Sequence, residues 1–195
     1  MNAKTRFLRH GWPFFLIWTV VSYVISDLAF LAKTNVKEEA KFGLFVAAHR
    51  VDAPGLRENI ESMALPGIEE TNVYAYDPSD NNYAEMFSLL GLRNSTCLVL
   101  PSSLLETDFS YCAPFSESEA KSLFPEAKYI QKEGSFYGFL LYDAETKQGK
   151  WQEYISYTEE DYYLCFRKGA LQVGDHIHFA ENQIITSFLK GIFTE

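Results

Sequence analysis

The chain has 195 residues, of which 47% are hydrophobic and 16% aromatic, so it has the size of one globular domain with an appendage, and its composition excludes a disordered protein. Its formal net charge is −9, and residues 1–33 carry more basic than acidic side chains, so the remainder is more acidic still. Such a surface repels phosphate groups, which excludes nucleic acid as a partner.

The N-terminal part contains a long apolar run over residues 11–32, GWPFFLIWTVVSYVISDLAFLA, in which Asp27 is the one charged side chain. A helix of that length spans about 30 Å, the thickness of a bilayer core. Basic side chains precede the run and acidic side chains follow it, which keeps the N-terminus cytoplasmic. The sequence therefore predicts a cytoplasmic stub and single-pass membrane anchor over residues 1–33, and an extracytoplasmic domain over residues 34–195 at the cell membrane.

Two alternatives to the anchor remain open. A cleaved signal peptide would have a shorter apolar region, and Phe30 stands where a small side chain is needed for a cut after Ala32. A core helix of a globular domain would show a polar stripe, and the apolar side chains here run all round the helix. The sequence favours the uncleaved anchor.

Helices and strands alternate in the first half of the domain. The apolar runs 41–47 and 95–101 are typical of strands buried on both faces, and residues 70–77 are β-branched and aromatic. Asp52 is expected to cap a helix that ends near residue 63. Further helices are expected over residues 83–90, directly after Ser103, and over residues 116–125.

The second half changes character. Residues 134–143, 150–157 and 161–168 are strand-like runs joined by polar turns, which indicates an antiparallel section. The chain ends in a helix with one apolar face over residues 184–193. The order of elements predicts an α/β fold, a single layered domain with a mixed sheet flanked by helices, preceded by one N-terminal transmembrane helix.

Several of these segments are similar to those of a known family. GSFYGFLLYD at 134–143 looks like the segment of type 2 extracellular solute-binding proteins in which two glycines and an aromatic lead into a hinge strand, and DYYLCFRKGAL and NQIITSFLKGIF look like their returning strand and following helix. KFGLFVAAHRVD and TCLVLPSSLL fit the early strands of the first lobe. The chain thus resembles the first lobe of such a periplasmic protein over residues 41–193.

The sequence departs from that family where the second lobe should be inserted. Residues 144–160 leave room only for a hairpin. Closure of two lobes around a ligand is therefore not implied. The resemblance implies instead a half cleft near Arg50, Ser102 and Tyr137, or a vacated surface that contacts another protein.

The half cleft supplies the candidate ligand-binding residues. Arg50 follows the first buried strand, at the edge where ligands bind in open α/β sheets, and can hold a carboxylate or phosphate. Ser102 and Ser103 follow the third strand, where backbone amides can bind an anion. The alternative is that Arg50 lies in a solvated loop and that both serines only cap a helix. No catalytic constellation is visible, because no base is signalled for a nucleophile.

Metal sites and cofactors have weaker signals. His176 and His178 would face the same side of an extended chain, as two metal ligands do, but no further ligand is signalled. Asp77 and the oxygen-bearing side chains that follow it miss the spacing of a calcium loop. Three cysteines leave at least one unpaired, although a bridge between Cys97 and Cys112 stays open. We expect no cofactor.

Together these features predict a membrane-anchored binding or protein-interaction module in a bacterial envelope, accessory to transport or envelope assembly, with another envelope protein as partner. The alternative is a small-ligand binder that uses the half cleft. A hydrolase or metal enzyme is the third hypothesis. An exposed apolar patch would favour the first hypothesis, and a pocket with converging polar groups at the strand ends would favour the second.

Overall fold

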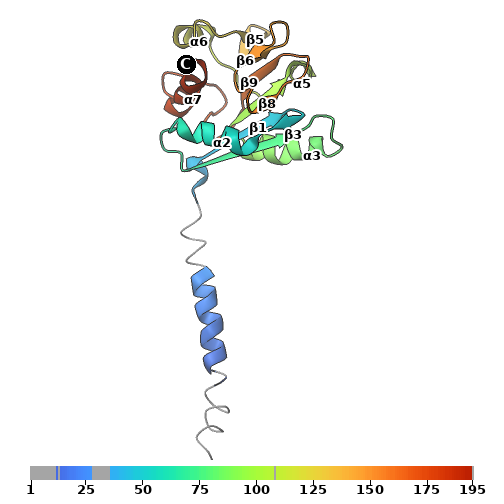
Figure 1. The fold of residues 1–195 in the computed structure, drawn as a ribbon. Coiled ribbons are helices and arrows are strands. Elements are labelled where there is room, and N and C mark those ends of the chain that lie inside the picture. Colours follow the sequence, from blue (N-terminus) through green and yellow to red (C-terminus); the bar gives the residue numbers. More distant parts are fainter. Residues whose placement is uncertain (1–11, 13, 28–35, 108, 195) are drawn as a thin grey trace, which may run out of the picture. The chain divides into compact units, whose positions relative to one another are not determined.

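The computed structural model describes Trp12 and residues 14–27, 36–107 and 109–194 (Figure 1). They belong to two compact units that meet between Lys37 and Glu38. Among the described residues, those of the first unit form one helix, and all the strands lie in the second unit, Glu38–Glu195.

The helix of the first unit corrects the expected membrane anchor. Trp12 and residues 14–27 are helical. Among the described residues, no helix combines the length and the hydropathy that a membrane span requires. The predicted transmembrane helix, and the membrane and signal-anchor assignment that depends on it, is therefore wrong. Residues 1–11, 13 and 28–33 of the expected anchor lie outside the described residues.

The domain is built on a mixed sheet with the strand order β3, β1, β4, β9, β6 and β5, and β7 pairs with the end of β6. β1 is parallel to both β3 and β4, whereas the other pairs are antiparallel. The strands are β1 (Lys41–Ala47), β3 (Glu70–Tyr76), β4 (Cys97–Pro101), β5 (Tyr129–Lys132), β6 (Ser135–Asp143), β7 (Gln148–Gly149) and β9 (Tyr162–Phe166). The mixed sheet agrees with the expected α/β class.

A second, two-stranded sheet joins β2 (Arg50–Val51) to β8 (Ile155–Ser156). The expected strand over residues 150–157 is thus reduced to its last part. The turn before β8 is anchored by Trp151, which is buried and whose indole nitrogen donates to Asn59 Oδ1 at 3.1 Å. This anchor ties the turn to the sheet face that α2 covers.

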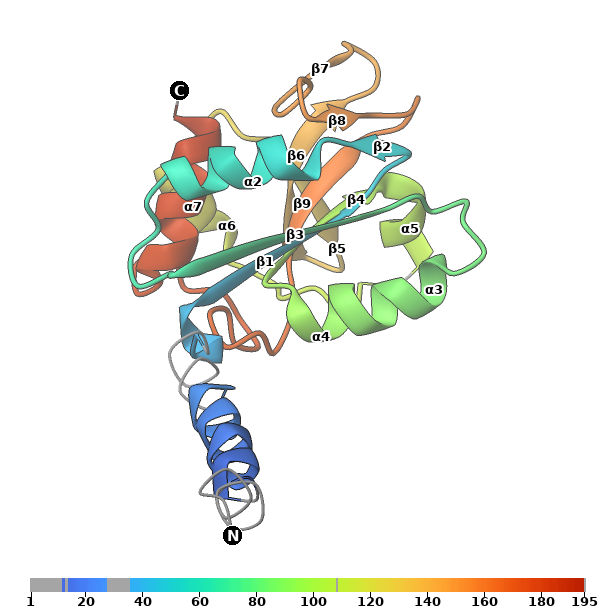
Figure 2. The ribbon, with the colours of Figure 1, turned by 60° about the horizontal axis from the view of Figure 1, so that its bottom comes forward.

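Helices cover both faces of the sheet, as Figure 2 shows. One face carries α2 (Ala53–Ser62), α6 (Glu117–Leu123) and α7 (Gln183–Phe193). The other carries α5 (Ser102–Thr107) and a continuous helical stretch, α3 (Tyr83–Met86), η2 (Phe87–Gly91) and α4 (Leu92–Asn94), in which η2 has the wider π-helical turn. A short 3₁₀ turn, η1 (Glu38–Ala40), leads into β1.

The side-chain alternation of β1 explains the two layers. Phe42, Leu44 and Val46 belong to the core beneath α2 and α7, whereas Phe45 and Ala47 belong to the core on the opposite face. All five are fully buried, so β1 is apolar on both faces, as the uninterrupted apolar run predicts.

Side-chain caps start the two helices that flank β1 on one face. Asp52 Oδ1 accepts from Gly55 N at 3.2 Å at the start of α2, and Asn182 Oδ1 accepts from Ile185 N at 3.0 Å at the start of α7. The expected cap at Asp52 is therefore confirmed. The expected apolar face of the last helix is also confirmed, because Ile185, Phe188 and its neighbours along that face are buried.

Candidate functional site

The carboxyl ends of β1 and β4 form the edge where a ligand is expected, because the strand order reverses between these two strands. This edge is occupied by a side chain of the protein. Glu160 Oε2 accepts hydrogen bonds from Ser103 N at 3.0 Å and from Ser102 Oγ at 3.3 Å. The expected anion-binding groups of both serines are therefore already bound to a carboxylate of the same chain.

A second contact at this edge joins the loop after β1 to the loop after β3. His49 Nδ1 and Asp77 Oδ2 form a hydrogen bond, and Asp77 Oδ1 also accepts from Ser79 N at 2.8 Å and from Ser79 Oγ at 2.7 Å. The backbone hydrogen bond from Ser79, assisted by His49, lowers the pKa of Asp77 to about 2. Both oxygens of Asp77 are thus engaged in fixing this loop.

The remaining half-cleft residues do not converge. Arg50 is exposed in β2, where its backbone pairs with Ser156. Tyr137 packs on Phe109, with ring centroids 5.1 Å apart, next to the end of β9 at Phe166. The backbone nitrogen of Ser102 donates to the carbonyl oxygen of Asp161, directly before β9. About 15 Å, the length of β9, therefore separates Ser102 from Tyr137. The structure brings Ser102 and Ser103 together and holds Tyr137 apart from them.

The candidate metal ligands His176 and His178 are both exposed and flank the buried Ile177, so they face the same side as expected. They line a cavity of about 570 Å³ together with Glu181. In the described ranges of the chain, no three His, Cys, Asp or Glu side chains are arranged to hold a metal ion.

The three cysteines are buried and free. Cys97 belongs to the core on the α2 and α7 face, whereas Cys112 and Cys165 belong to the core on the opposite face. The sheet therefore separates Cys97 from Cys112, and the bridge left open by the sequence does not form.

Polar side chains converge instead at the amino-terminal end of the parallel strands, around a cavity of about 360 Å³ that we call the amino-edge pocket. Its lining comes from η1, β1, β3, the end of α4 and the loop after β9. Its lining includes the charged and amide side chains of Glu38, Lys41, Glu70, Asn72, Arg93, Arg167 and Gln172.

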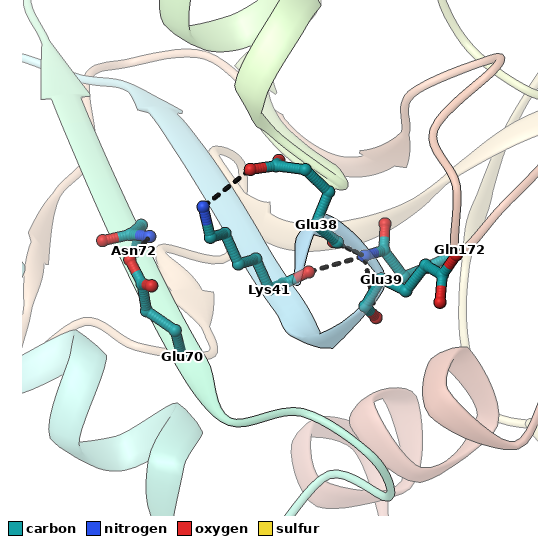
Figure 3. A network of polar contacts seen from close by, with 6 residues as sticks. All are labelled: Glu38, Glu39, Lys41, Glu70, Asn72 and Gln172. Carbon is teal, nitrogen blue, oxygen red and sulfur yellow. Dashed lines mark hydrogen bonds and ion pairs between the residues drawn. The ribbon is translucent and has the colours of Figure 1, made fainter. Parts of the chain in front are cut away.

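The register of β1 and β3 builds one wall of the amino-edge pocket. Lys41 lies opposite Glu70 and Gly43 lies opposite Asn72, so these residues share one face of the sheet. Figure 3 shows the ammonium of Lys41 turned to Glu38, 2.6 Å away, and Asn72 beside Glu70, whose Oε1 accepts from the amide at 2.7 Å. The hydrogen bond with Glu38 raises the pKa of Lys41, so its ammonium stays charged.

Gly43 lets the end of α4 close the pocket. A Cβ atom at this position would lie 2.3 Å from the carbonyl oxygen of Asn94 and 2.8 Å from Ser95 Cα. The end of α4 therefore packs directly against β1 at Gly43. This close approach requires glycine at position 43.

Gln172 fastens the loop after β9 to the same place. Its Nε2 donates to the carbonyl oxygens of Lys41 at 2.6 Å and Glu38 at 3.2 Å (Figure 3). Its Oε1 accepts from Thr96 Oγ1 at 3.2 Å. Its own carbonyl accepts from Asn182. One side chain thus holds η1, β1 and β4 together around the pocket.

Two arginines complete the lining. Arg167 is half-buried, and its Nε donates to the carbonyl oxygen of Ser95 at 2.5 Å. Burial lowers the pKa of this guanidinium. Arg93, in α4, is exposed at the rim. The pocket therefore contains two guanidinium groups in addition to the paired Lys41.

The sequence-based reasoning missed these residues because they come from separate segments. The one local signal is the polar alternation of Glu70, Asn72 and Tyr74, which lies on a single face of β3. Neither arginine carries a motif that would connect it to that strand.

The largest of the three cavities, about 770 Å³, lies between the end of α6, the end of α7 and β6. Apolar side chains such as Leu123, Phe124 and Phe193 form much of its lining. Its pair Lys128 and Asp143 is bonded internally at 2.6 Å. This cavity offers fewer converging polar groups than the amino-edge pocket.

Comparisons with family models, with curated proteins and with solved structures found no match for this chain. The resemblance to a solute-binding-protein lobe therefore stays a prediction.

Proposed function

We propose that the domain Glu38–Glu195 binds a small polar ligand in the amino-edge pocket. The observation that carries the proposal is the convergence of charged and amide side chains from five segments on one cavity of about 360 Å³. That volume lies in the range of small-molecule sites, about 300–1,000 Å³, and such sites combine a concave shape with a few convergent polar groups.

The distribution of apolar surface also favours a ligand-binding domain. Within residues 36–107 and 109–194, Leu89 and Leu171 are the large hydrophobic side chains that are exposed. Two such side chains do not make the broad apolar patch that a protein-interaction surface of this domain would need. For this domain, the small-ligand hypothesis is therefore better supported than the protein-interaction hypothesis that the sequence favoured.

The chemistry of the pocket lining favours binding over catalysis. The lining contains no histidine or cysteine among the described residues. Its lysine is held charged by Glu38, and a charged ammonium is a poor base. The remaining groups are suited to hold a ligand by charge and hydrogen bonds.

A thermal-shift titration of the full chain tests the proposal, with amino acids, sugars and short peptides each supplied up to millimolar concentration. A saturable shift is expected. The substitution Asn72→Trp puts an indole into the pocket from a β-strand that tolerates aromatics, and should abolish the shift. Arg50→Ala, at the opposite edge of the sheet, is the control. A shift that survives N72W and disappears in R50A would contradict the proposal and restore the half cleft.

The helical segment of the first unit supports a second candidate function, self-association. Its exposed large apolar side chains include Phe14, Ile17 and Trp18. We propose that this segment pairs with its counterpart in a second copy of the chain, because that contact buries like apolar surface on both sides. Sedimentation of the full chain should give a mass above 22.3 kDa, and I17S/W18S should lower it. A single-chain mass for the unsubstituted protein would contradict this.

A further inference from the structure

We infer that the ligand of the amino-edge pocket carries an anionic group, a carboxylate or a phosphate monoester, and that Arg93 and Arg167 bind it. The inference rests on the proposed function and adds to it the class of the ligand. Three observations lead to it: the local charge of the pocket, the hydrogen bonds already made by its cations, and the burial of Arg167.

The pocket is cationic on an acidic protein. Its lining contains one lysine and two arginines against the two carboxylates of Glu38 and Glu70, whereas the whole chain has a formal net charge of −9. A local excess of positive charge inside a concave site concentrates field lines and attracts anions to that point. The surrounding acidic surface makes this pocket a distinct location for a small anion.

The two arginines have donors left for a ligand. Lys41 is engaged with Glu38, but neither Arg93 nor Arg167 forms an ion pair with any side chain in the described part of the protein. Arg167 uses Nε on the carbonyl oxygen of Ser95, which orients the guanidinium and leaves its two terminal nitrogens. A guanidinium fork matches the paired oxygens of a carboxylate or phosphate.

The burial of Arg167 points in the same direction. A half-buried cation without an anionic partner is costly, and burial lowers the pKa of this side chain accordingly. An anion bound against it would offset the lost hydration. On the other wall, Asn72 and Glu70 present amide and carboxylate oxygens, so the rest of the ligand is expected to carry hydrogen-bond donors.

Calorimetric titration of the full chain with three probes, sodium acetate, inorganic phosphate and glycerol, at constant ionic strength tests the inference. Acetate or phosphate should bind and glycerol should not. R93Q should weaken anion binding by about tenfold or more, the size expected when a charge-assisted hydrogen bond is lost. R167K retains the charge and should weaken binding through loss of the fork, while circular dichroism reports whether the variant is folded. R50Q, an exposed arginine at the opposite edge, is the matched control.

Each outcome has one meaning. Stronger binding of acetate assigns a carboxylate, and stronger binding of phosphate assigns a phosphate monoester. Anion binding that is unchanged in a folded R93Q/R167K protein overturns the inference. If a neutral compound gives a shift that N72W abolishes, while neither anion binds, the proposed function stands and the anionic class falls. If no compound of either panel binds, both fall.

Discussion

The backbone nitrogen of Ser103 donates a hydrogen bond to the carboxylate of Glu160, 3.0 Å away, and the neighbouring Ser102 hydroxyl approaches the same oxygen at 3.3 Å. The contact crosses from the start of α5 to the turn before β9. It fills the position where an anion would otherwise meet the first amides of α5 at the carboxyl edge of the sheet. The protein thereby closes the edge at which many α/β sheets bind their ligands.

Removal of that carboxylate should lower stability. Glu160→Ala leaves the Ser103 amide and the Ser102 hydroxyl without their partner, and the loss of such a helix cap costs about 1 kcal/mol. Urea unfolding followed by circular dichroism measures the change. Glu159→Ala, at an exposed neighbouring acid, serves as the control and should be close to neutral. Equal midpoints for the two variants would show that the Glu160 contact contributes nothing.

Gly43→Ala should be destabilising by about 1–3 kcal/mol, as overpacking in a close contact usually is. The added methyl group would meet the carbonyl oxygen of Asn94 at 2.3 Å, and a backbone atom cannot move aside as a side chain can. The helix end must shift away from β1, so the pocket should also lose affinity for its ligand. Chemical denaturation compares G43A with E58A, an exposed position in α2. A G43A protein as stable as E58A would contradict the close approach.

The stability contributed by Asp77 should disappear in acid. The hydrogen bonds from Ser79 and His49 lower its pKa from an ordinary value of 3.8 to about 2, so the folded state binds this proton less tightly than the unfolded state. The stabilisation is therefore complete above about pH 4 and is lost as the pH falls toward 2. Asp77→Asn should unfold at a lower temperature than the unsubstituted protein at pH 7, and the difference should vanish near pH 2.

Melting curves at several pH values measure this difference, with Asp80→Asn in the same loop as the control. A gap between D77N and the unsubstituted protein that stays constant from pH 7 to pH 2 would show that the ionised carboxylate is not the source.

The three thiols should be unreactive in the folded protein. All three cysteines are buried, and burial raises the pKa of Cys97 and Cys165, which suppresses the thiolate that reacts. A colorimetric thiol reagent should label none of them rapidly in buffer and all three in urea. Rapid labelling of one thiol without denaturant would contradict the burial of that residue.

Local patterns of the sequence determined several elements by themselves. The apolar runs of β1 and β4, the cap at Asp52 and the apolar face of α7 follow from side-chain period and capping chemistry, which act within a few residues. The same local reasoning was wrong for the apolar N-terminal segment. Its hydropathy predicted a membrane span, but no helix among the described residues combines the length and the hydropathy that a span requires.

Only the tertiary structure decided where polar side chains from distant segments converge. Glu160 follows Ser102 by 58 residues, and no local pattern shows that its carboxylate fills the carboxyl edge. Lys41, Asn72 and Arg167 likewise line one cavity because of strand register, the close approach at Gly43 and the hydrogen bonds of Gln172. Periodicity assigns a side chain to a face, but which distant side chains share that face depends on long-range pairing and packing.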